Sequence, residues 1–164
     1  MKRRLIARYR YLWTWELANA LIVFPIAVFA IGRHFAVSLS TVLALLALCS
    51  VLIAGAAFAF LKYRDLKCQT TRIQRYRNAF CLLRWSIPVL LIGVLVVGCF
   101  YTLTSGASDW PLALVLYLLA VAEYINYFHV QLMYDNPSDI RFLRQQKRLK
   151  RGLIARYLTG EFRE

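Results

Sequence analysis

Four long stretches of this sequence carry almost no charge, and they limit what the chain can fold into more than any other feature. The stretches that we expect to cross a membrane are residues 11–32, 36–61, 85–104 and 110–134. Each has the length of roughly 20 residues that an α-helix needs to cross about 30 Å of hydrocarbon. Backbone groups cannot stay unpaired in lipid, so segments this apolar should be helical. A chain of 164 residues is too short to bury four such helices within a soluble core. We therefore expect an all-α integral membrane protein with four transmembrane helices, arranged as two hairpins.

The start of the chain also resembles a secretory signal, because three basic residues precede an apolar run. Glu16 and Asn19 interrupt that run, and the run is longer than the core of a typical signal. We therefore expect the first stretch to remain in the protein as a membrane-spanning helix.

The placement of the basic residues predicts the orientation of these helices. Arg and Lys are concentrated in residues 1–10, in the connection 62–84 and after the fourth stretch, whereas Arg33 stands alone between the first two stretches. Basic loops mark the cytoplasmic side of a membrane. Both termini and a basic loop over residues 62–84 should therefore lie in the cytoplasm, at a plasma membrane of the bacterial inner-membrane type. The net charge of +13 then indicates anionic lipid headgroups as a partner rather than nucleic acid.

The C-terminal region should form one more helix. After the break at Asn136 and Pro137, apolar residues recur at helical spacing among Arg and Lys, which predicts a basic amphipathic helix over residues 137–160. We expect it to lie along the inner leaflet. The alternative is packing on the basic loop or on a partner protein, and repulsion between like charges disfavours the loop. The residues expected to contact headgroups or a partner are Arg141, Arg144, Lys147, Arg148, Lys150 and Arg151.

One short sequence occurs twice. The pentapeptide Leu-Ile-Ala-Arg-Tyr stands at residues 5–9 and again at residues 153–157, both times in a basic segment. A duplicated partner-binding or membrane-surface element is one interpretation. We favour the other interpretation, which is coincidence between two segments of similar composition.

Several polar residues interrupt the first and fourth apolar stretches. Ionisable residues at membrane depth are costly and mark functional sites by default. The candidate residues are Glu16, Asn19, Glu123, Asn126, Tyr127 and His129. At 100° per residue, Glu123, Asn126 and Tyr127 share one narrow stripe of a helix. If the first and fourth stretches are neighbours, the polar residues of the first would meet Asn126 and His129 of the fourth.

Two interpretations of this cluster remain open. Hydrogen bonds between helices would make it structural, and this is the interpretation that we favour. Alternatively, it binds a proton, an ion, a lipid headgroup or a pigment. A metal held by protein side chains is not expected, because Glu123 and His129 lack the Glu-x-x-His spacing that places two ligands on one face. His129 alone could ligate a haem or a chlorin, so the cofactor is undetermined.

No motif in the sequence points to catalysis. A nucleophile elbow, a Walker loop and a zincin motif are all missing from the sequence, so we do not expect an enzyme. The favoured function is an accessory or assembly subunit that contacts other membrane proteins, or a second copy of itself, at the inner leaflet. The alternative is a homo-oligomeric transporter or channel that carries protons or cations through Glu16, Glu123 and His129. A membrane-embedded enzyme or a pigment- or haem-binding protein comes third.

Overall fold

The protein is helical throughout the part of the chain that the structure describes. The computed structural model describes residues 2–33, 37–68, 73–105, 109–132, 137–147 and 149–160. The elements are α1 (Lys2–Ala18), the π-helical turn η1 (Asn19–Val23), α2 (Phe24–Gly32), α3 (Leu39–Cys68), the 3-10 turn η2 (Ile73–Tyr76), α4 (Arg77–Ser105), α5 (Trp110–Phe128), α6 (Pro137–Gln146) and α7 (Leu153–Leu158). Four helical segments are long and apolar enough to cross a membrane, namely Leu5–Gly32, Leu39–Cys68, Ile73–Thr104 and Trp110–Phe128. The expectation of an all-helical chain with four helices of this kind is therefore confirmed.

The helices do not end where the apolar stretches end. α1 begins at Lys2, α3 continues to Cys68 and α4 starts at Arg77, so most of the range predicted as a basic loop is helical. Arg and Lys are good helix formers, and hydropathy marks where a helix meets water rather than where its hydrogen bonding stops. At the other extreme, α5 ends at Phe128 instead of continuing to residue 134, because His129 takes a non-helical backbone conformation.

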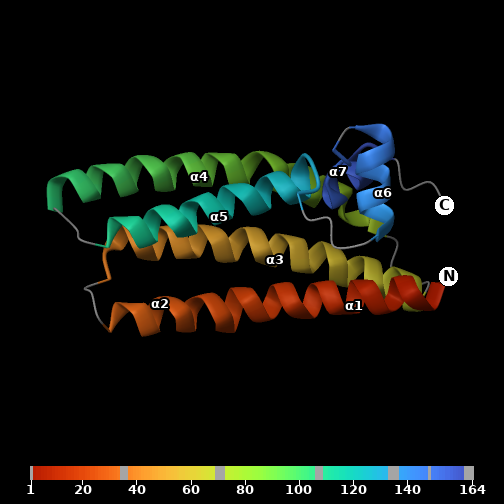
Figure 1. The fold of residues 1–164 in the computed structure, drawn as a ribbon, viewed down its shortest axis with the longest axis horizontal. Coiled ribbons are helices and arrows are strands. Elements are labelled where there is room, and N and C mark those ends of the chain that lie inside the picture. The colour runs from red at the N-terminus through yellow and green to blue at the C-terminus, as the bar shows by residue number, and fades with distance from the viewer. Residues whose placement is uncertain are drawn as a thin grey trace.

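α3 is the central helix of the bundle. In Figure 1, α1 and α2 lie along one side of it and α5 and α4 along the other. Of the most apolar window of each span, 56% is buried in α3, compared with 11% in the first span and 22% in the third. The buried face of α3 is rich in small residues, which allow neighbouring helices to approach closely. The helices at the two sides instead turn much of their apolar surface outward.

The π-helical turn η1 accommodates Pro25, which would disrupt a regular α-helix in the first span. Proline has no N–H, and its ring collides with the carbonyl one turn earlier in a regular α-helix. The chain widens here, and the N–H of Phe24 donates to the carbonyl oxygen of Asn19. Pro25 has no N–H to offer Ala20, whose carbonyl oxygen instead accepts a bond from Cys49 Sγ of α3 at 3.1 Å. This bond connects the first span to the central helix.

Both termini of the bundle lie at the same end in Figure 1, together with α6 and α7; we call it the basic end. At the opposite end, Asp109 connects the starts of two helices. Its Oδ2 accepts bonds from the N–H of Ser38 and from the hydroxyl of Thr41, both at 2.7 Å. Burial raises the pKa of the Asp109 carboxyl, but these hydrogen bonds outweigh burial and hold it below its usual value.

The single helix expected over residues 137–160 is wrong, because the chain forms α6 and α7 with a non-helical stretch between them. α7 is not a surface helix either. Tyr157 packs edge-on against Phe58 and Phe80, and its hydroxyl donates to the carbonyl oxygen of Ile73 at 2.7 Å. Arg77 donates to the carbonyl oxygen of Leu158 at 3.1 Å. Repulsion between basic segments did not prevent this contact, because the surfaces that meet are aromatic rings, apolar side chains and backbone carbonyls.

Candidate functional site

The site begins with an aromatic side chain laid across the central helix. If Gly55 of α3 carried a Cβ, that atom would stand 2.6 Å from Cζ of Tyr127. Only glycine leaves room for the ring at this point. The ring can therefore cross the surface of α3, and its hydroxyl reaches the first span on the far side.

Two carboxyl groups approach that hydroxyl. Tyr127 interacts with Glu16 of α1 and with Glu123 of its own helix, and the two carboxyl groups also interact with each other. The ring is buried, with 6% of the residue exposed. Among the described residues, however, its hydroxyl has no hydrogen-bond partner of regular geometry. The hydroxyl therefore interacts with the two carboxyl groups without a hydrogen bond of good geometry to either, and a buried phenol in this condition calls for an explanation.

A cavity of about 230 Å³ opens beside this cluster at the basic end. Its walls come from α1, from the end of α5 and from the C-terminal segment. The lining residues are Leu5, Arg8, Tyr9, Leu12, Glu16, Asn126, Tyr127, Gln131, Lys150, Leu153 and Arg156. The cavity therefore combines three cationic side chains with one carboxyl group and an apolar flank.

The C-terminal segment is held against the end of α5 by its backbone. The N–H of Gln131 donates to the carbonyl oxygen of Lys150 at 2.7 Å, and the N–H of Gly152 donates to that of His129 at 2.9 Å. A Cβ on Gly152 would stand 2.6 Å from the carbonyl oxygen of Asn126. Glycine at this position is thus required for the close approach that places Lys150 and α7 beside α1.

The repeated pentapeptide reappears at this cavity. Leu5 and Arg8 come from the first copy, Leu153 and Arg156 come from the second copy, and all four line the same cavity. The two copies are separated by almost the whole chain, so their sequence similarity gives no reason to expect them to be neighbours. The tertiary structure brings their leucine and arginine side chains to one place, which our preferred interpretation of coincidence did not anticipate.

The candidate polar residues are only partly brought together. Glu16, Asn126 and Tyr127 line the cavity, and Glu123 lies beside Tyr127 and accepts a bond from Asn126 Nδ2 at 3.3 Å. The carbonyl oxygen of the Asn126 side chain accepts a bond from the N–H of Leu132 at 2.9 Å. The predicted proximity of the first and fourth spans is therefore found at these residues.

Asn19 and His129 are not among the residues that line the cavity. Asn19 begins η1, one turn beyond Glu16. His129 follows the last residue of α5 and is exposed, and its Nε2 lies 3.3 Å from the hydroxyl of Tyr124. That hydroxyl donates to the carbonyl oxygen of Arg84, at 2.9 Å. The expected meeting of Glu16 with His129 is thus replaced by a meeting with Glu123 and Tyr127.

The basic residues expected to contact headgroups are distributed over several places. Arg141 and Arg144 are exposed on α6, Lys147 follows that helix, and Arg151 is exposed in an isolated antiparallel bridge with Val130. Lys150 lines the cavity, and Arg148 lies outside the described residues. Arg8 and Arg156 were not among the predicted site residues, although both belong to the repeated pentapeptide.

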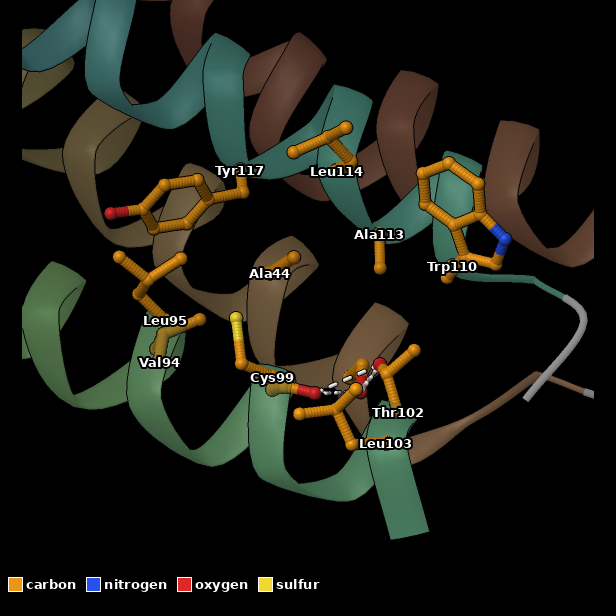
Figure 2. A pocket seen from close by; sticks show the side chains of 12 residues that line it. Ala44, Val94, Leu95, Cys99, Thr102, Leu103, Trp110, Ala113, Leu114 and Tyr117 are labelled. Carbon is orange, nitrogen blue, oxygen red and sulfur yellow. Dashed lines mark hydrogen bonds between the residues drawn. The ribbon is translucent and has the colours of Figure 1, made fainter. Parts of the chain in front are cut away.

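A second hollow lies toward the opposite end, between α3, α4 and α5. It has a volume of about 250 Å³, and Figure 2 shows Leu95, Leu103 and Tyr117 among the side chains around it. Two of its hydroxyl groups are already bonded, and one of them, the Ser40 hydroxyl, donates to the carbonyl oxygen of Gly98 at 3.0 Å. Thr102 bonds to the same carbonyl oxygen, at 2.8 Å. This hollow is therefore a mainly apolar groove in which the hydroxyl groups of Ser40 and Thr102 are already bonded.

Within the described residues, no three side chains of His, Cys, Asp or Glu lie close enough together to hold a metal ion. No protein-family model, no curated protein and no solved structure matches this chain. The protein is therefore described by its own fold and site. It is a helical chain with four helices of membrane-spanning length and a polar, mainly cationic cavity at one end.

Proposed function

We propose that this chain is a multi-pass membrane protein that acts as a non-catalytic accessory or assembly subunit, with its basic end at the cytoplasmic face of a plasma membrane. The distribution of Arg and Lys supports this orientation, because the three basic segments belong to the end that carries both termini. The subunit would contact other membrane proteins there and would rest on anionic headgroups.

One observation carries this proposal: among the described residues, a layer of fully buried apolar side chains lies between the polar groups at the two ends of the bundle. Between the cluster around Tyr127 and the apolar groove, α3 and α5 contribute Leu48, Val51 and Ala120, each of which is 0% exposed. An ion or a polar solute would meet a dry, close-packed layer at this point. This apolar layer therefore favours binding over transport through a single chain.

α6 supplies the surface for a partner. Figure 1 shows it running across the basic end of the bundle rather than along the long helices. It packs extensively against none of the other described elements. Its exposed Arg141 and Arg144 face away from the core, so a basic helical surface is open to an acidic partner or to headgroups.

The test is purification in mild detergent from the native membrane, followed by native mass measurement. The wild-type chain of 19.0 kDa should appear in a heteromeric complex. Neutralisation of α6 by Arg141→Gln, Arg144→Gln and Lys147→Gln should remove the partner. The control replaces three basic residues elsewhere at the same end, Lys2→Gln, Arg3→Gln and Arg75→Gln, and should keep it. A wild-type mass equal to the chain or to a multiple of it would overturn the proposal.

A homo-oligomeric transporter is the second candidate, and the approach of Glu16 and Glu123 to one tyrosyl hydroxyl favours it. In that case the path would run between protomers. Reconstituted wild-type protein would then show a proton or cation flux, and Glu123→Gln would abolish the flux without unfolding the protein. A folded wild-type protein with no flux under a pH or potential gradient excludes this candidate.

A further inference from the structure

The residues that line the cavity at the basic end indicate which kind of ligand the cavity would bind. This question goes beyond the proposed subunit role. Three cationic side chains, Arg8, Lys150 and Arg156, share it with the carboxyl group of Glu16. The lining therefore has an excess of positive charge. Each of the three cations also takes part in an interaction within the protein. An anionic group is thus the ligand that the lining favours.

The two guanidinium groups favour an anion with several oxygen atoms, such as a phosphate or a carboxylate. Arginine presents a planar fork of N–H donors that fits phosphate and carboxylate in a bidentate manner, whereas lysine acts as a point charge. Arg8 and Arg156 occupy equivalent positions in the two pentapeptides and enter the cavity from α1 and from α7. A tetrahedral group with several oxygen atoms can accept from both forks and from Lys150 at once.

The base of the cavity differs from its rim. Along α1, Glu16 is two turns from Arg8, a separation of about 12 Å at 1.5 Å per residue. Beside Glu16 lies the buried Tyr127 hydroxyl, which has no regular hydrogen-bond partner among the described residues. The carboxyl group of Glu16 accepts readily from a hydroxyl at this depth. The base therefore suits a neutral hydroxyl-bearing part of the ligand, with the phenol as the additional donor.

The position of the cavity adds an apolar component. Leu5, Leu12 and Leu153 form one flank, at the level where α1 passes from its charged start to its apolar body. Basic pockets between membrane helices at this level are suited to phospholipid headgroups. We propose that the two copies of Leu-Ile-Ala-Arg-Tyr form a paired-arginine site at the basic end that binds a phosphate group, with Tyr127 as a further donor at its base. This site does not depend on the proposed subunit role.

The experiment uses the full chain in nanodiscs and measures bound lipid by native mass spectrometry. Discs of phosphatidylcholine alone are compared with discs that also contain phosphatidylglycerol, which has one phosphate and a free hydroxyl-bearing headgroup. We expect one phosphatidylglycerol molecule to be retained. Arg8→Gln or Arg156→Gln should each lower its affinity by about tenfold, because a charge-assisted hydrogen bond is lost. Tyr127→Phe should lower it by about three- to tenfold, because a neutral hydrogen bond is lost.

Each matched control makes the same kind of substitution, Arg→Gln or Tyr→Phe, at a residue that does not line the cavity. The Arg3→Gln change lies on the exposed surface of α1, Arg75→Gln lies in the turn η2, and Tyr11→Phe changes an exposed tyrosine. Each should bind like wild type. Because Arg156 belongs to a buried helix, Lys150→Gln serves as a second cavity variant, and thermal unfolding is recorded for every protein.

Inorganic phosphate identifies the source of the bound group. If phosphate competes with labelled phosphatidylglycerol only weakly, the natural ligand is a lipid. If phosphate alone stabilises the detergent-purified chain and Arg8→Gln removes that effect, the ligand is a soluble phosphate compound. The proposal is overturned if the folded cavity variants retain as much lipid and respond as much to phosphate as their controls. The α6 variant does not alter the cavity, so the subunit role can fail separately.

Discussion

The phenol ring of Tyr127 rests against Gly55, and a Cβ at Gly55 would come within 2.9 Å of three atoms of the ring. This contact allows the fourth span to reach the first across the central helix. It brings the hydroxyl of Tyr127 close to both Glu16 of α1 and Glu123 of α5. The site at the basic end therefore depends on a residue that has no side chain of its own.

Gly55→Ala should destabilise the protein by about 1–3 kcal/mol, the usual cost of overpacking a close-packed interior. It should also weaken any phosphate binding, because the ring must move away from the cavity. The change is measured by thermal or denaturant unfolding in detergent.

Gly93→Ala is the matched control for that substitution. Nothing lies within 4 Å of the position where its Cβ would stand. Alanine also favours a helix over glycine by about 1 kcal/mol. This variant should equal or exceed wild-type stability, and an equal loss in both variants would contradict the role given to Tyr127.

Asp109 should make the stability of the bundle sensitive to acid. Its pKa is lowered in the folded protein, because the carboxylate accepts bonds from Ser38 and Thr41. A carboxyl group with a depressed pKa stabilises the fold at every pH above its unfolded value of about 3.9, and this stability is lost as pH falls through the folded value. Melting temperature should therefore decline below a pH of about 4.

Asp109→Asn should reduce stability at neutral pH and flatten that decline. Asp65→Asn is the control, since Asp65 forms an ion pair with Lys62 at 3.5 Å on the same helix. Identical pH profiles for wild type and Asp109→Asn would show that Asp109 is not responsible for the acid sensitivity.

Tyr157→Phe should loosen the attachment of α7. The substitution removes the hydroxyl that donates to Ile73 at 2.7 Å and leaves a buried carbonyl oxygen without that partner. A loss of about 1–3 kcal/mol is expected. Hydrogen exchange of residues 149–158 should accelerate, whereas Tyr11→Phe on the exposed face of α1 should leave it unchanged. Unaltered exchange in Tyr157→Phe would argue against α7 as a packed element.

Cysteines at positions 5 and 153 should be bridged by a short bifunctional maleimide reagent, because both leucines line one cavity. The four natural cysteines, all free in the structure, are replaced first. A cysteine at position 3 paired with position 153 is the control, since Arg3 is exposed and does not line the cavity. Equal bridging of both pairs, or of neither, would contradict the convergence of the two pentapeptides.

The amino-acid sequence by itself determined the class of structure. Hydrocarbon demands that every backbone group be bonded within its own segment, so four apolar stretches of sufficient length predict four helices regardless of how they pack. Polar residues within those stretches could be found as well, because charge at membrane depth is rare. Glu16, Glu123 and Tyr127 were identified in this way.

Only the tertiary structure decided which of these residues meet. The long helices are apolar around most of their surfaces, so periodicity could not show that Gly55 would receive Tyr127. The burial of α7 could not be inferred from the sequence either, because Tyr157 packs against Phe58 and Phe80, which are far away along the chain. The two pentapeptides can be recognised in the sequence itself. Their convergence on one cavity depends on long-range packing and on Gly152, whose missing side chain lets the C-terminal segment lie against the end of α5.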